Sequence, residues 1–204
     1  MKYTDLLIKG LLLLLLVFST SAQASKRVAL IIGNSNYENV EKLKNPANDA
    51  KALAETLQNI GFDDVTLKLD LGNAALQRTL GQFAKRAAGA DIAMLYFAGH
   101  GIEVGGTNFV IPVDAKLSHV DDVDFEAVDL SKIMRALNRA SKLKLVVLDA
   151  CRNNPFSSTM QRDQGNRSVG RGLSRVNLPG GKTLVAYAAK EGTVAADGAG
   201  QNSP

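Results

Sequence analysis

Apolar residues form four short, nearly continuous runs along the chain, each bounded by glycine or polar residues. A run without polar interruptions is typical of a strand buried on both faces of a parallel sheet. These runs are residues 27–33, 91–98, 143–148 and 183–189. A fifth segment, 64–70, alternates between apolar and polar residues and predicts a more exposed strand.

The segments between these strands place apolar residues three and four positions apart, which is the period of an amphipathic helix. We expect the first helix to begin at Pro46 and to end with Gly61 as its C-terminal cap. Asn73 is expected to cap a second helix and Asp129 a third.

Strands that alternate with helices predict βαβ units and a mostly parallel sheet covered on both faces. The expected fold class is therefore α/β, a three-layer α/β/α sandwich. Gly105 and Gly106 separate two short β-like pieces, 102–104 and 108–111, which predicts a hairpin. A length of 204 residues fits one domain with a full core.

Residues 157–182 differ from the rest because they are rich in Ser, Gly, Asn and Arg and lack an apolar period. A stretch of this length without secondary structure is usually functional or disordered, and we expect a mobile, solvated linker. Its basic residues, set against the single acid Asp163, are Arg162, Arg167, Arg171, Arg175 and Lys182.

The first 24 residues have the features of a secretory signal peptide. Lys2 and Lys9 precede an apolar run at 11–18, and Ala22 and Ala24 form a small-residue cleavage site. The run is shorter than the roughly 20 residues that a spanning helix needs. We expect cleavage after Ala24, export to the periplasm or the medium, and no stable membrane anchor afterwards.

Composition narrows the function classes. Hydrophobic residues at 46% and charged residues at 22% exclude disorder for the bulk of the chain. Aromatic residues at 5%, the absence of Trp and a net charge of +4 argue against a nucleic-acid partner. The one cysteine forms no intrachain disulfide, so it is a buried apolar residue, an intermolecular link or a reactive thiol. The oligomeric state stays open.

Ligands of open parallel sheets bind at the carboxyl ends of the strands. His100 follows one predicted strand and Cys151 follows the next, and this pair is the minimum set for thiol nucleophilic catalysis. The glycines beside His100 favour an exposed loop that substrate can approach. The alternatives are a core cysteine and a solvated loop histidine, which is what we expect of His119. No metal site is expected, because the ligands are too few.

The motifs YFAGHG at 96–101 and DACR at 149–152 place His100 and Cys151 51 residues apart. With them the sequence resembles the caspase-like cysteine peptidases, most closely the bacterial metacaspase-type members. The resemblance covers essentially the whole of 25–204. Its other stretches are 28–37, 43–50, 109–114, 147–156 and 186–203.

This resemblance implies a role for each matching residue. His100 matches the catalytic histidine and Cys151 the nucleophile, while the backbone N–H groups of Gly101 and Cys151 match the oxyanion hole. Asp149 and Asp49 match two carboxylates of the S1 pocket, which binds the side chain before the scissile bond. Such a pocket selects Arg or Lys, because paired carboxylates favour a cation.

The resemblance also divides the chain into a large-subunit-like part, 25–156, a linker, 157–182, and a partial small-subunit-like part, 183–204. Asp114 and Asp129 match an acidic cluster by which many metacaspases bind calcium, but an acid after the cysteine is missing. We expect no cofactor and leave calcium dependence open. The family continues with a further helix and strand after this point, and Ser203-Pro204 is typical of a helix start. The sequence thus stops where a helix should begin, so we expect that the gene is shortened, that the sequence is a fragment, or that a partner completes the fold. An exposed sheet face would then threaten stability.

The prediction is an exported cysteine endopeptidase that cleaves proteins or peptides after Arg or Lys. Such an enzyme would meet its own linker at high effective concentration, which predicts self-cleavage after Arg162, Arg167, Arg171 or Arg175. The alternative is a catalytically inactive caspase-like scaffold or interaction module. A nucleotide-binding domain is disfavoured, because the residues after Gly33 lack the G-x-G-x-x-G motif.

Overall fold

The computed structural model describes residues 25–151, 154–157, 159–161, 168–169, 173–174 and 182–187. The predicted signal peptide, 1–24, lies outside the described residues, as do the candidate cleavage residues Arg162, Arg167, Arg171 and Arg175. The backbone of Cys151 is described as the last residue of a strand.

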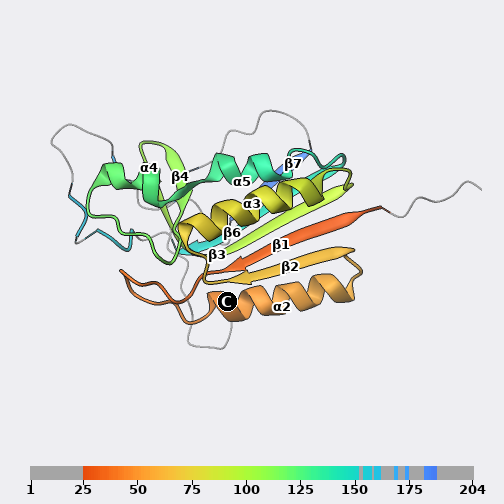
Figure 1. Cartoon of the computed structure of the whole chain (residues 1–204), viewed down its shortest axis with the longest axis horizontal. Coiled ribbons are helices and arrows are strands. Elements are labelled where there is room, and N and C mark those ends of the chain that lie inside the picture. The colour runs from red at the N-terminus through yellow and green to blue at the C-terminus, as the bar shows by residue number, and fades with distance from the viewer. Residues whose placement is uncertain are drawn as a thin grey trace, which may run out of the picture.

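A parallel sheet forms the centre of the described chain (Figure 1). Its strands follow the spatial order β2-β1-β3-β6-β7, and every neighbouring pair is parallel. The α/β prediction with a mostly parallel sheet is therefore confirmed. The strands are β1 (Arg27–Gly33), β2 (Asp64–Leu69), β3 (Ile92–Val104), β6 (Leu143–Cys151) and β7 (Thr183–Tyr187).

Helices cover both faces of this sheet. Helix α2 (Pro46–Asn59) lies on one face, and α3 (Asn73–Ala87) and α5 (Leu130–Leu137) lie together on the other (Figure 1). The sequence of β1 is apolar throughout because its alternate residues are buried on opposite faces. Leu30 packs in the core between the sheet and helices α3 and α5 (the α3–α5 core), and Ile31 packs in the core between the sheet and α2 (the α2 core). Burying one such side chain contributes about 1.5–3 kcal/mol.

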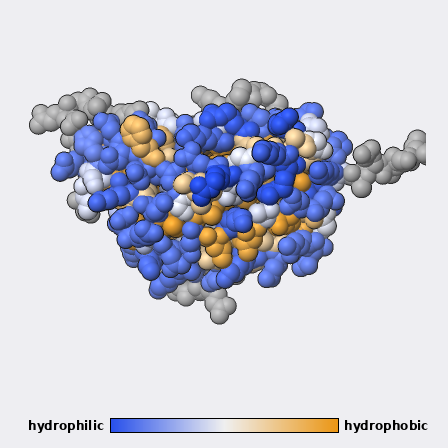
Figure 2. Space-filling view, viewed as in Figure 1, coloured by the Kyte–Doolittle hydropathy of each residue, from blue (hydrophilic) through white to orange (hydrophobic). Residues whose placement is uncertain are grey.

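Strand β2 lies at one edge of the described sheet and shows its apolar residues on the surface. Figure 2 shows hydrophobic residues gathered over this strand, between α2 and α3. Val65, Leu67 and Leu69 of β2 are half-buried against the α2 core. At the other edge, Leu184 of β7 is 54% exposed beside the half-buried Leu145 of β6.

A smaller antiparallel sheet continues from β3. Residues Gly101–Val104 pair with β4 (Thr107–Val110), and β4 pairs with β5 (Val128–Asp129). The turn between β3 and β4 has φ values of 58° at Gly105 and 83° at Gly106, a left-handed conformation that glycine adopts without strain. The predicted hairpin is confirmed, although it begins inside the long strand β3.

The helix caps agree with the sequence at two of three positions. Gly61 follows the end of α2 with φ of 83°, and Asp129 Oδ1 accepts a hydrogen bond of 2.6 Å from the Ser131 N–H. Asn73 is the first residue of α3 and not its cap, so that prediction was wrong. Gly72 precedes the helix, and Asp114 from a distant loop accepts the Asn73 N–H at 2.8 Å.

His119 is a capping residue, contrary to its predicted place in a plain solvated loop. Its Nδ1 accepts the Asp121 N–H at 3.3 Å, at the start of the short helix η1 (Val120–Asp122) that leads into α4 (Val123–Glu126). In return the Asp122 carboxylate accepts the His119 N–H at 2.7 Å. These bonds satisfy N–H groups that a helix start leaves without partners.

The described residues of 157–182 are anchored to the domain, which corrects the expectation of a wholly solvated linker. Gln161 donates its N–H to Ser118 O at 2.8 Å, and Ser168 O accepts the Gly105 N–H at 2.8 Å. Leu173 is 3% exposed and packs in the α3–α5 core. Ser174 exchanges two hydrogen bonds of 2.7 Å with the Asn108 side chain.

Among the described helices, none is long and apolar enough to cross a membrane.

Candidate active site

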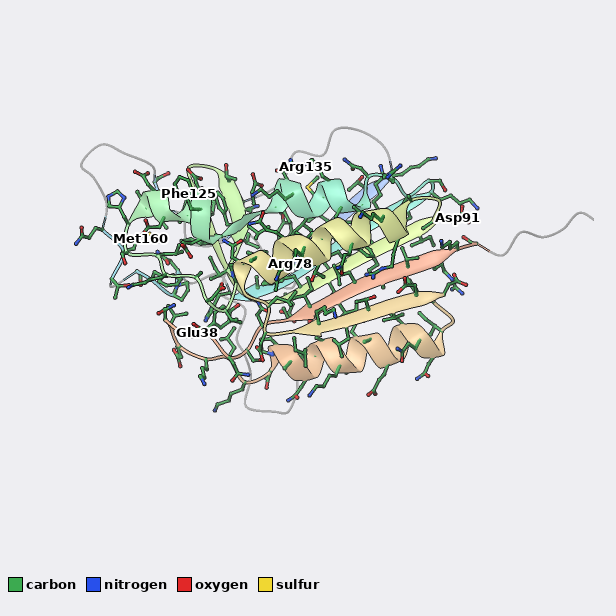
Figure 3. The ribbon with its side chains drawn as sticks, in the orientation of Figure 1. Glu38, Arg78, Asp91, Phe125, Arg135 and Met160 are labelled. Atoms are coloured by element: carbon green, nitrogen blue, oxygen red, sulfur yellow. The ribbon has the colours of Figure 1, made fainter. Side chains whose placement is uncertain are left out.

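The backbones of His100 and Cys151 are brought together by neighbouring parallel strands. The two residues form the last register pair between β3 and β6. This pair lies at the carboxyl end of both strands. In Figure 3, Glu38, which follows β1, lies at that end of the sheet, whereas Asp91, which precedes β3, lies at the opposite end. The predicted meeting of the two residues at the carboxyl ends of the strands agrees with this register.

His100 lies within a strand and is 6% exposed, so the expectation of an exposed loop was wrong. Strand β3 continues past the parallel sheet because the hairpin supplies new partners. The first of them is the Ile111 N–H, which donates to His100 O at 3.0 Å. The histidine is therefore held on a paired backbone, which fixes its position more firmly than a loop would.

The His100 imidazole is oriented by a backbone carbonyl. Its Nε2 lies 3.0 Å from the carbonyl oxygen of Glu41, in the segment between β1 and α2. A carbonyl oxygen can only accept a hydrogen bond, so this contact favours the tautomer with the proton on Nε2. Nδ1 then carries the lone pair, as a group that accepts a proton from a thiol must.

Tyr37 supports the same histidine through a hydrogen bond to its backbone and a contact between the two rings. The Tyr37 hydroxyl accepts the His100 N–H at 2.7 Å and donates to Ile111 O at 3.2 Å. The two rings lie 4.4 Å apart between centroids and are inclined by 53°, and Tyr37 is 2% exposed. The sequence showed Tyr37 as part of the family resemblance but gave it no role. Its position just after the first buried strand was the one available signal.

The glycines on both sides of His100 make room for neighbouring side chains. Gly99 has φ of 153°, and a Cβ atom there would lie 2.6 Å from the Tyr37 hydroxyl oxygen. A Cβ atom on Gly101 would lie 3.2 Å from Ala150 Cβ and 3.3 Å from Leu173 Cδ2. These close approaches, rather than the approach of a substrate, explain the glycines in the structure.

The two predicted S1 carboxylates act on one buried tyrosine. Asp149 lies two residues before Cys151 in β6, and its Oδ2 accepts a hydrogen bond of 2.9 Å from the Tyr96 hydroxyl. Asp49 lies in the first turn of α2. Burial raises the pKa of the Tyr96 hydroxyl, and the charge of Asp149, the bond to it and the charge of Asp49 raise it further. The structure therefore brings both carboxylates near this phenol.

Asp114 and Asp129, which match calcium ligands of the family, both serve helix starts in the structure. Asp114 accepts the first N–H of α3, and Asp129 caps α5. Within the described residues, no group of three or more His, Cys, Asp or Glu side chains could hold a metal ion. Both aspartates therefore have a structural role at a helix start.

The sequence is similar to known proteins and to one protein-family model. It is 33% identical over 138 residues to the human mucosa-associated lymphoid tissue lymphoma translocation protein 1 and 32% identical to the mouse homolog. The alignments cover 67% of this chain but only 16% of either relative. The caspase-domain family model, peptidase family C14, matches residues 26–204. The chain therefore belongs to the caspase-domain family.

Proposed function

We propose that the protein is a cysteine endopeptidase that hydrolyses peptide bonds after Arg or Lys. The observation that carries the proposal is the pairing of His100 with Cys151 at the carboxyl ends of β3 and β6, in a chain of the caspase-domain family. The Glu41 carbonyl and the Tyr37 hydroxyl support the histidine in an orientation suited to proton transfer.

The proposed reaction proceeds through an acyl-enzyme. The Cys151 thiol transfers its proton to His100, its sulfur attacks the peptide carbonyl carbon, and the carbonyl oxygen becomes an oxyanion. Backbone N–H groups of Gly101 and Cys151 stabilise that charge, an effect worth about 3–4 kcal/mol per donor. His100 protonates the leaving amine as the C–N bond breaks. It then takes a proton from the water that hydrolyses the thioester.

Specificity is proposed to come from Asp149 and Asp49. The hydrogen bond to Tyr96 and the combined action of both carboxylates on that phenol support a shared acidic pocket. Two partly buried carboxylates attract a guanidinium or ammonium group and repel an acidic side chain. We expect cleavage after Arg or Lys and negligible cleavage after Asp.

The test compares chain 25–204 with its Cys151→Ala and His100→Ala variants on fluorogenic peptides with Arg, Lys or Asp before the bond. The Arg and Lys peptides should be cleaved by the unsubstituted chain alone. An Arg chloromethylketone should label Cys151 stoichiometrically in the native protein and much more slowly in His100→Ala.

Two results would reject parts of the proposal. A preference for the Asp peptide would overturn the acidic pocket. A folded chain that neither turns over substrate nor reacts with the chloromethylketone faster than denatured protein would reject the peptidase and favour an inactive caspase-like scaffold.

A further inference from the structure

The Tyr96 hydroxyl donates a hydrogen bond to Asp149, a carboxylate of the proposed specificity pocket. The residue lies in the middle of β3 and is 7% exposed. Its ring packs in the α2 core with Met94 and Ala98. The hydroxyl donates a hydrogen bond of 2.9 Å to Asp149 Oδ2, from the neighbouring strand β6.

Strand register explains why this bond forms. Tyr96 pairs with Val147, and Asp149 lies two residues further along β6. Residues two apart on a strand project from the same face. Val147 packs in the α2 core, so Asp149 also belongs to the α2 face of the sheet. Asp49 in the first turn of α2 faces the same layer and acts on the same phenol.

The phenol remains a donor over the whole physiological range of pH. Burial, followed by the charges of Asp149 and Asp49, raises the pKa of the Tyr96 hydroxyl above its ordinary value. A neutral hydroxyl that donates to a carboxylate stabilises the ionised form of that carboxylate. The bond holds the Asp149 carboxylate in one orientation.

We infer that Tyr96 is a positioning residue for specificity, whose hydroxyl orients the Asp149 carboxylate toward the cationic side chain that precedes the scissile bond. The inference rests on the proposed function and deepens it. Tyr96 acts through Asp149 and does not touch the reacting atoms. A hydrogen bond to a charged group typically changes binding about tenfold to a hundredfold when it is lost.

The variant Tyr96→Phe removes the hydroxyl and keeps the ring that packs in the α2 core. We expect KM for an Arg peptide to rise at least tenfold while kcat changes less than threefold. The dissociation constant of benzamidine, an amidinium probe of the pocket, should rise by a similar factor. Reaction of Cys151 with iodoacetamide, which needs no pocket, should keep its rate.

The matched control is Tyr187→Phe, which removes the hydroxyl that donates to Ser174 O at 3.2 Å. It should leave both KM and benzamidine binding unchanged. A double-mutant cycle supplies the second test: in an Asp149→Ala background, Tyr96→Phe should change benzamidine binding less than twofold, because the group that it positions is gone.

Three results would overturn the inference. The first is unchanged benzamidine binding in Tyr96→Phe, and the second is an equal loss in the presence and absence of Asp149. The third is slower iodoacetamide reaction together with equal losses on all substrates, which would indicate a general structural role.

Failure of the proposed function is a separate outcome. A chain that binds benzamidine without cleaving peptides rejects the peptidase, and benzamidine affinity of Tyr96→Phe still decides the inference. A chain that does not bind benzamidine at all rejects the carboxylate pocket and the inference with it.

Discussion

His100 is fixed by contacts to its ring and to its backbone, and both come from the segment that follows β1. The Glu41 carbonyl meets the imidazole, and the Tyr37 hydroxyl meets the His100 N–H while donating to Ile111 O. Tyr37 thus links the histidine to the chain just beyond β4. Of the two groups that support His100, only the Tyr37 hydroxyl can be removed by a side-chain substitution, because the Glu41 group is a backbone carbonyl.

The variant Tyr37→Phe should impair both stability and rate. The buried His100 N–H would lose its acceptor, which costs about 1–3 kcal/mol in the free energy of unfolding. We expect kcat on an Arg peptide to fall about tenfold as the imidazole loses its support. Urea denaturation and steady-state kinetics measure the two effects, with Tyr187→Phe as the control. An unchanged kcat would show that the Glu41 carbonyl suffices.

Gly99 provides a second prediction at this scale. In Gly99→Ala the new methyl group would lie 2.6 Å from the Tyr37 oxygen and 3.0 Å from Phe97 Cζ, on a backbone with φ of 153°. We expect the free energy of unfolding to fall by about 2 kcal/mol or more. Gly81→Ala is the control, because nothing lies within 4 Å of its Cβ in α3. There alanine should stabilise by about 0.5–1 kcal/mol, and equal effects of the two variants would contradict the argument.

The sequence was sufficient to bring His100 and Cys151 together but not to find what supports them. Their pairing follows from two predicted buried strands, 91–98 and 143–148, which His100 and Cys151 follow closely in the sequence. Tyr37 and Tyr96 act across 63 and 53 positions of sequence. Nothing in the local pattern distinguishes a supporting tyrosine from a core tyrosine, because the difference lies in what the hydroxyl meets after folding.

Strand lengths show the same limit for whole elements. The apolar runs predict strands that stop at Ala98 and Leu148, whereas β3 reaches Val104 and β6 reaches Cys151. Hydrogen-bond partners decide these ends: β4 supports the end of β3, and β3 itself supports the end of β6. The layers, the hairpin and two of the three helix caps depend on local pattern and were predicted correctly.

Helix α3 depends on an aspartate from another part of the chain. Asp114→Ala should lower the free energy of unfolding by about 0.5–2 kcal/mol, because the first N–H of α3 loses its acceptor. Asp114→Asn keeps an acceptor and should lose less. We expect activity on an Arg peptide to be the same with and without the chelator EGTA. Loss of activity in EGTA, together with normal stability of Asp114→Ala, would instead assign Asp114 to calcium.

The end of β2 is tied to the segment after β1 by a charged group. The Asp70 carboxylate accepts the N–H groups of Ser35 and Asn36 at 2.8 and 2.9 Å and the Asn36 side-chain amide at 2.8 Å. Burial raises the pKa of Asp70, but the bonds from Asn36 and Ser35 and the charge of Lys42 outweigh it. The pKa in the folded protein is therefore below its ordinary value.

This direction predicts how Asp70 contributes to stability as pH changes. A carboxyl with a lowered pKa stabilises the fold above its unfolded pKa of about 3.9, and the contribution is lost as pH falls through the folded value. Asp70→Asn should therefore be less stable than the unsubstituted chain at pH 7, and the gap should narrow below about pH 4. Urea denaturation at pH 7 and pH 3 measures it. A gap independent of pH would show that charge plays no part.

At the scale of the whole molecule, the segment after β6 is attached to the domain at several points and continues into β7. Its described residues contact Ser118, Gly105, Asn108 and the α3–α5 core. Strand β7 then pairs with β6 from Thr183 to Tyr187. A cut between these attachments would leave both pieces bound to the same sheet.

We therefore expect self-cleavage after one or more of Arg162, Arg167, Arg171 and Arg175, with fragments that stay associated. Incubation of chain 25–204, mass spectrometry of the new termini and gel filtration measure both effects. The core strands should remain uncut, because their backbones are paired and buried. Cys151→Ala should stay intact, and its cleavage would indicate a contaminating protease. A chain that cleaves an Arg peptide yet stays whole would contradict self-processing.

The last register pair of β3 and β6 makes the proposed dyad depend on completion of folding. Before the two strands align, the imidazole and the thiol belong to separate stretches of chain, and a slip of one residue would turn one strand's side chains to the opposite face. This register pair also depends on β3, which must pair with β1, β4 and β6. If the proposed peptidase is correct, a newly made or partly folded chain has no assembled dyad, and activity arises only with the finished sheet.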